Sequence, residues 1–120
     1  MLHEDVTKEI IGSAFEVHRI LGYGFLERVY QRAMQVELHN RCLNAELESE
    51  IRVTYKAEEV WFYKADLLVN RSVIVELKAA KTCQAEDEAQ LLNELKATGI
   101  RIGLLINFGR TKVEFKRFIM

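Results

Sequence analysis

Hydrophobic residues in the first part of the chain recur every three or four positions, which is the period of an amphipathic helix. The pattern predicts one helix over residues 4–21 and a second over residues 25–43, separated by the turn-forming Gly22 and Gly24. Glu27 lies in the first turn of the second helix, where the helix dipole favours a carboxylate. The expected apolar face of that helix consists of Leu26, Val29, Tyr30, Ala33 and Val36, with Met34 and Leu38 at its margin.

After residue 44 the hydrophobic period shortens to two. Residues 45–55 alternate apolar and charged side chains, so they predict a strand with one solvent-exposed face near the edge of a sheet. Thr82 is the expected cap of a later helix with an acidic start, and Gly99 marks its end. The remaining predicted elements are strands over residues 60–69 and 73–78, that helix over residues 86–97, and strands over residues 102–107 and 112–118.

The predicted order is therefore helix, helix, three strands, helix, strand, strand (ααβββαββ). Three successive strands most simply form an antiparallel meander, and a strand, helix and strand unit implies a parallel neighbour. We expect an α/β (α+β) fold, with a mixed β-sheet flanked by helices. With 120 residues and no linker or repeat, residues 1–120 are expected to form a single domain.

Composition and charge narrow the class of protein. Hydrophobic residues make up 49% and charged residues 29%, the balance of a globular chain, and the net charge of −1 gives no overall attraction to nucleic acid. Binding of a polyanion would require a local patch of basic residues. The alternative interpretation of such residues is a solvated edge strand that carries charge. The candidate basic residues near the end of the chain are Arg101, Arg110, Lys112, Lys116 and Arg117.

Location and cysteine usage add two expectations. No apolar run approaches the roughly 20 residues of a membrane span, and the charged start is unlike a signal peptide, so we expect a cytoplasmic protein. Cys42 and Cys83 lack metal-ligand spacing and are interpreted as free thiols in a reducing compartment.

The hairpin formed by residues 60–69 and 73–78 carries the candidate chemistry. If Asn70, Arg71 and Ser72 form its loop, Val69 pairs with Val73, and counting back sets Asp66 opposite Glu76 on one face. A loop of even length would move Asp66 to the other face. Directly opposed side chains have β-carbons roughly 5 Å apart, so two carboxylates there would repel each other.

A hard divalent cation between these carboxylates would remove the repulsion. Mg²⁺ takes oxygen ligands and often binds one or two carboxylates. Lys78 shares the face of Glu76 and would add a positive charge that stabilises an anion or orients a water molecule. The alternative is a solvated sheet face that happens to carry Asp, Glu and Lys.

These residues also resemble a known family. Asp66, followed ten residues later by Glu76-Leu77-Lys78, resembles the catalytic signature of the PD-(D/E)XK nuclease superfamily. The segment Gly24-Phe25-Leu26-Glu27-Arg28-Val29-Tyr30 matches the Gly-x-x-Glu-x-x-Tyr pattern of the GxxExxY family within it. Further matches, such as Lys96-Ala97-Thr98-Gly99, extend over nearly the whole chain, which is identified by resemblance as a member of this family.

The resemblance implies a restriction-endonuclease-like fold and a role for each matching residue. Asp66, Glu76 and the Leu77 carbonyl would bind Mg²⁺ or Mn²⁺, and Glu27 would complete or orient that set of ligands. Lys78 would position the attacking water and stabilise the phosphate. Gln90 matches a further motif that lies near the metal in related nucleases.

Some positions depart from the family or have a structural explanation. Tyr23 replaces the usual Pro, and Glu94 replaces a common Tyr four residues after Gln90, where an acid would repel phosphate or face solvent. For His18 we expect a packing or capping role. The aromatic residues Trp61, Phe62 and Tyr63 are expected in the core, although they would also be able to stack on bases.

Three functional hypotheses follow. The leading one is a metal-dependent nuclease that hydrolyses phosphodiester bonds in DNA, with RNA as the alternative. The second is a catalytically quiet module with a nuclease fold that binds nucleic acid or protein, and the third is a domain that binds a small phosphorylated ligand. Pairing into a homodimer is a reasonable way for so small a chain to cover a duplex.

Overall fold

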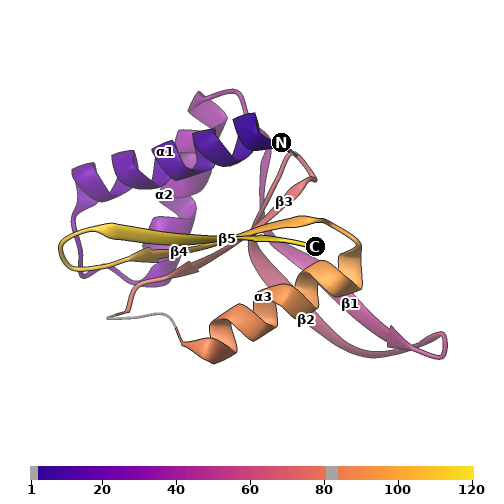
Figure 1. The fold of residues 1–120 in the computed structure, drawn as a ribbon. Helices are drawn as coiled ribbons and strands as arrows, with labels where there is room; N and C mark the ends of the chain where they lie inside the picture. Colours follow the sequence, from indigo (N-terminus) through magenta and orange to yellow (C-terminus); the bar gives the residue numbers. More distant parts are fainter. Residues whose placement is uncertain (1–2, 81–83) are drawn as a thin grey trace.

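The computed structural model describes residues 3–80 and 84–120, which form one five-stranded sheet with helices packed on it (Figure 1). The order ααβββαββ is as predicted. The elements are α1 (Glu4–Leu21), α2 (Glu27–Asn40), β1 (Ala45–Tyr55), β2 (Glu58–Val69), β3 (Val73–Lys78), α3 (Ala85–Thr98), β4 (Ile102–Phe108) and β5 (Val113–Ile119).

The strands lie in the order β1-β2-β3-β4-β5, so the predicted edge position of β1 is confirmed. Neighbours are antiparallel except β3 and β4, which the crossover through α3 makes parallel. The β2–β3 loop uses Asn70 and Arg71 with φ of 49° and 52°, and Val69 pairs with Val73 as the sequence predicts. The same register continues through Leu67 and Val75 toward Asp66 and Glu76.

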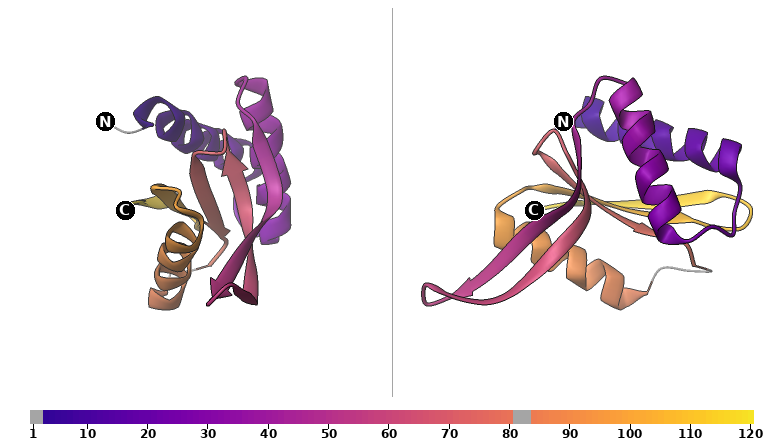
Figure 2. Two further views of the ribbon diagram at one scale, coloured as in Figure 1. Left: turned by 90° about the vertical axis from the view of Figure 1, so that its right-hand side faces the viewer. Right: turned by 180° about the vertical axis from the view of Figure 1, so that it is seen from behind.

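The helices cover both faces of the sheet (Figure 2). On one face, α1 and α2 pack with Leu67, Val75 and Leu77 around a larger hydrophobic cluster. On the other face, Leu91 and Leu95 of α3 pack against a smaller cluster. The sheet is therefore buried on both sides near its centre, where β4 is buried along its whole length.

Helix α2 lies on the sheet rotated from the predicted orientation. Val36 and Leu26 are 61% and 78% exposed, whereas Met34 and Leu38, predicted at the margin, are fully buried. Gln31 is also buried because its side chain reaches the backbone of β2. Periodicity identifies the apolar residues of a helix, but tertiary contacts decide which sector of it faces the sheet.

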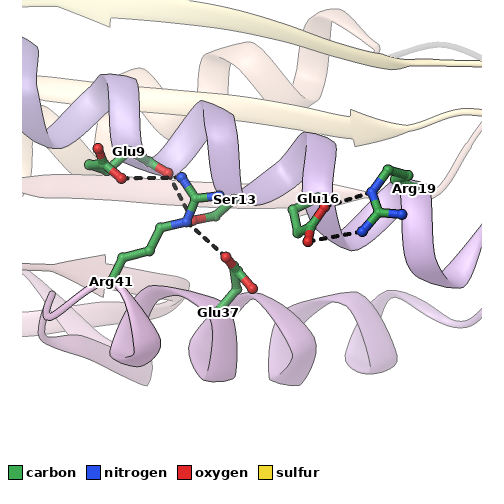
Figure 3. A network of polar contacts seen from close by, with 6 residues as sticks. All are labelled: Glu9, Ser13, Glu16, Arg19, Glu37 and Arg41. Atoms are coloured by element: carbon green, nitrogen blue, oxygen red, sulfur yellow. Dashed lines mark hydrogen bonds and ion pairs between the residues drawn. The ribbon is translucent and has the colours of Figure 1, made fainter.

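An ion-pair network ties the first two helices together (Figure 3). Arg41, at the end of α2, bonds to Glu37 of its own helix at 2.8 Å and to Glu9 of α1 at 3.1 Å. Gly12 allows this approach, since a β-carbon there would lie 2.8 Å from the Arg41 Nη1. A second pair, Arg19 with Glu16, lies within α1 and joins no other element.

The outer half of the β1–β2 hairpin extends beyond the rest of the sheet and is called here the arm, residues 52–62 (Figure 2). Trp61 and Phe62 are 64% and 47% exposed, so their predicted place in the core is wrong. The physical reason is that β2 has 12 residues and β3 only 6, which leaves the arm without a neighbour beyond β2. Tyr63, at the base of the arm, is partly buried against the α3 cluster, as expected.

Three smaller expectations concern caps, thiols and membrane spans. Gln84 and Asp87 form a capping box at the start of α3, and Gly99 ends it with φ of 75°. The expected Thr82 cap and the Cys83 thiol lie outside the described residues, while Cys42 is free and exposed. Among the described helices none is long and apolar enough to cross a membrane.

Candidate active site

Asp66 and Glu76 meet where β2 and β3 begin to separate. The Asp66 amide donates to the Glu76 Oε1 at 3.0 Å, and the Leu77 amide donates to the Asp66 Oδ2 at 2.7 Å. The last backbone pair of the register before this point is Leu67 with Val75. Each carboxylate therefore binds the backbone of the opposite strand, and the two predicted acids are brought together by these side-chain bonds.

A local irregularity in the sheet opens this site. In a regular strand Ala65 and Leu68 would face opposite sides of the sheet, yet both contribute to the cluster under α3, and Leu67 belongs to the opposite cluster. The alternation of side chains between the two faces of β2 therefore shifts by one residue around Asp66. On β1, Glu48 occupies the place opposite Asp66 in the register and has a φ of 51°. The shift lets β2 turn away into the arm while β3 stays paired with β4.

Glu94 lies inside the site, so of the two alternatives for this acid, repelling phosphate or facing solvent, the second is wrong. The residue is 0% exposed, and its carboxyl group faces that of Glu76 within hydrogen-bonding range. Gln90 donates to the Glu94 Oε2 at 3.0 Å. The predicted Gln90 therefore reaches Glu76 only through Glu94, an acid whose burial the helical pattern alone did not reveal.

Burial disturbs the titration of these acids. Burial, together with the charges of Asp66 and Glu94, raises the pKa of Glu76 to about 9. Burial also raises the pKa of Asp66, although the Leu77 amide and Lys78 oppose it, and burial raises the pKa of Glu94. Glu76 is therefore protonated at neutral pH and can donate its proton to Glu94.

Lys78 is held over the site by an acid of the opposing helix. Its Nζ lies 3.4 Å from the Asp87 Oδ1, with the lysine side chain 30% exposed. Burial lowers the pKa of Lys78, but the facing carboxylates of Asp87 and Glu27 outweigh that effect and raise it overall. Asp87 was missed in the sequence, although its place three residues after Gln84 is the capping-box spacing.

Glu27 reaches the same region from the far side of the sheet. As the first residue of α2, it accepts a bond of 3.4 Å from the Ala79 amide, directly after Lys78. Its charge also raises the pKa values of Asp66 and Lys78. The fold therefore brings all of the residues in the predicted set, from α2, β2, β3 and α3, to one part of the sheet.

Two positioning residues were not identified in the sequence. Gln31 donates to the Asp66 carbonyl at 2.9 Å, and it lies four residues after Glu27 on the same helical face. Asn107, the β4 partner of Lys78, bonds to both the amide and the carbonyl of Ala80 at 3.0 and 2.9 Å. The signal for Asn107 was a single amide in an otherwise apolar strand.

Other candidate residues make contacts elsewhere. His18 bonds to the Gly109 carbonyl at 2.7 Å, a packing role as expected. In the basic C-terminal segment, Lys116 pairs with Glu88 at 2.9 Å and Arg110 lies over the ring of Tyr23. β5 is an edge strand of the sheet, so these charges also fit the alternative of a solvated edge.

No group of three or more His, Cys, Asp or Glu among residues 3–80 and 84–120 is arranged to hold a metal ion. The chemistry of the donors nevertheless fits a hard cation. Asp66 and Glu76 supply carboxylate oxygens, and the Glu94 Oε1 is buried without a bond from any amide, hydroxyl or cation in the described part of the chain. Rotation of these side chains toward one another would be needed to bind the ion.

A mixed sheet with helices on both faces and an Asp, Glu and Lys set between diverging strands defines a restriction-endonuclease-like fold. The family model of the PD-(D/E)XK nuclease superfamily matches residues 4–118, and the chain belongs to this superfamily. No curated protein sequence matches the chain.

Among solved structures, the one titled "Crystal structure of SSO0001" is similar, with a TM-score of 0.61 and 17% sequence identity. The match covers 98% of this chain and 59% of that one. This chain thus spans a little over half the length of its structural neighbour, and the likeness at this identity is one of fold.

Proposed function

We propose that the chain is a metal-dependent nuclease of the GxxExxY branch that hydrolyses phosphodiester bonds in DNA or, alternatively, RNA. The observation that carries this proposal is the convergence of Asp66, Glu76 and Lys78 where β2 and β3 separate, with Glu27 of α2 beside them. Membership of the nuclease superfamily supports the same reaction.

In this proposal each residue has one task. Asp66, Glu76 and the Leu77 carbonyl hold Mg²⁺ or Mn²⁺, and Glu27 completes or orients the set. A bound ion of this kind neutralises phosphate charge and lowers the pKa of its water. Lys78, charged at neutral pH, leaves Asp87 to orient the attacking water and to stabilise the phosphate.

The test is cleavage of labelled single-stranded DNA, duplex DNA, branched DNA and RNA with Mg²⁺ or Mn²⁺. Lys78→Ala is compared with Lys8→Ala, which removes an exposed lysine of α1 far along the chain from the motif. We expect metal-dependent cleavage that Lys8→Ala retains and Lys78→Ala loses by roughly 10²- to 10³-fold. Equal activity in all three proteins would instead indicate a contaminating nuclease.

A second candidate is a catalytically quiet module that binds nucleic acid or protein. The observation in its favour is that Lys78 is already paired with Asp87 and Glu76 with Glu94, which leaves the site closed by its own contacts. Absence of cleavage by folded, metal-loaded protein on all substrates, with retained binding of one of them, would favour this module. Binding should then fall only slightly in Lys78→Ala, because one phosphate contact is lost.

The preference for DNA and pairing into a homodimer are also part of the proposal. A chain of 120 residues covers only part of a duplex, so a dimer would extend the contact. Sedimentation of the protein with and without duplex DNA tests the dimer, and competition between DNA and RNA in the cleavage assay tests the substrate.

A further inference from the structure

Glu94 is an acid in a place that suits an apolar residue. It is fully buried on α3 between Leu91 and Leu95, both of which pack into the cluster under the sheet. An ionised carboxylate in such a place requires a cation or several donors. Gln90 supplies one donor, to Oε2, and no amide, hydroxyl or cationic group in the described part of the chain bonds to Oε1.

The charges that face Glu94 are mostly of its own sign. From β3 it faces Glu76, and from β2 it faces Asp66. The nearby cation, Lys78, is paired with Asp87 in the first turn of the same helix. In the metal-free protein, only a proton shared with Glu76 relieves the contact between the two carboxyl groups.

We propose that Glu94 is a third carboxylate ligand of the divalent cation, beyond the Asp66 and Glu76 of the motif. The inference rests on the proposed metal-dependent function and extends it to a residue that the family pattern does not include. The carboxyl group of Glu94 faces Glu76 of β3 and lies near Asp66 of β2, so carboxyl groups from three elements meet in this part of the site. As these side chains lie, no three acids in the described part of the chain are arranged to hold an ion, so binding requires their rotation. Small hard cations bind carboxylate oxygens and keep the rest of their shell as water.

The test is Mn²⁺ binding without any substrate, measured by isothermal titration and by loss of the free Mn²⁺ signal in electron paramagnetic resonance. Glu94→Gln keeps the size of the side chain but removes its charge, and Glu94→Met removes its oxygens altogether. Glu86→Gln, at an exposed position of the same helix, is the control for a general loss of negative charge. Circular dichroism confirms that each variant is folded.

We expect wild type and Glu86→Gln to bind Mn²⁺ equally, and both Glu94 variants to bind it roughly 10- to 100-fold more weakly. Unchanged affinity in the Glu94 variants would overturn this inference and leave the nuclease proposal intact, with Glu94 as a structural acid. Absence of Mn²⁺ binding by wild type would overturn both. If Glu94→Gln does not fold, the result for Glu94→Met decides.

Discussion

Among the residues of the site, two buried acids, Glu76 and Glu94, lie beside the partly buried Asp66 with little compensating positive charge. In the unfolded chain the Glu76 carboxyl group ionises at ordinary acidic pH. In the folded protein its pKa is raised to about 9, so it keeps its proton at neutral pH. The folded state therefore binds more protons between these two values, and stability falls as pH rises through that window, by at most about 1.4 kcal/mol per pH unit for one group. The raised pKa values of Asp66 and Glu94 act in the same direction.

We accordingly expect the metal-free protein to lose stability between about pH 5 and pH 9, as measured by urea unfolding at each pH. Glu76→Gln should flatten this profile because the titrating group is gone. Added Mn²⁺ should also flatten it, since a ligated carboxylate is already deprotonated. A metal-free stability that rises across this range would show that Glu76 is ionised in the folded protein.

Asn107 allows a second prediction. Asn107→Ala removes the two bonds that hold Ala80 next to the end of β3, and it leaves a small cavity in a fully buried strand. We expect a loss of about 1–2 kcal/mol in the free energy of unfolding. Asn40→Ala, at an exposed position at the end of α2, should cost below about 0.5 kcal/mol. Similar losses in both variants would contradict the positioning role.

The sequence was informative about residues whose neighbours are set locally. The odd length of the Asn70 to Ser72 loop fixes the hairpin register, and this register brings Asp66 to Glu76. Glu94 was beyond such reasoning, because its surroundings depend on how α3 lies across β3 and β4. Its spacing from Gln90 predicted only that both lie on one face, and that face proved to meet the site.

Among the elements, α2 places Glu27 at the site and Gln31 against β2. The contacts that hold α2 against α1 therefore help to fix the positions of both side chains. Helical periodicity predicted α2 itself, yet its rotation followed from contacts far along the chain. The buried Gln31 shows why, since a polar residue that no hydrophobic pattern would place inside is held there by the Asp66 carbonyl.

The Arg41 network gives a prediction for this pair of helices. Arg41→Ala removes ion pairs with Glu9 and Glu37 that join α1 to α2, so we expect a loss of about 1 kcal/mol in the free energy of unfolding. Arg19→Ala breaks a pair that lies within α1, where the arginine side chain is 69% exposed, so it should cost measurably less than Arg41→Ala (Figure 3). Urea unfolding in low and high salt measures both, and equal losses would mean that the network does not join the helices.

For the molecule as a whole, the element order, the antiparallel meander and the parallel crossover neighbour were predicted from the sequence, because hydrophobic periods and short connections leave few arrangements. The place of β5 beside β4 was not predicted. The exposed position of the arm could not be predicted from the sequence. Its exposure depends on the different lengths of β2 and β3, and the apolar pattern of Trp61 and Phe62 resembles that of a core strand. Only the assembled sheet shows that nothing in the described chain covers that end.

Trp61 is the only tryptophan of the chain, which makes the exposure of the arm directly measurable. With 64% of its surface accessible, it should emit near the wavelength of free tryptophan in water and be quenched readily by acrylamide. The emission should change little on mild denaturation, because the indole is already hydrated, whereas circular dichroism reports loss of the sheet. Blue-shifted emission that acrylamide does not reach would mean that the arm is covered in solution. Dilution then distinguishes the causes, since contact with a second copy of the chain weakens at low concentration and packing within one chain does not.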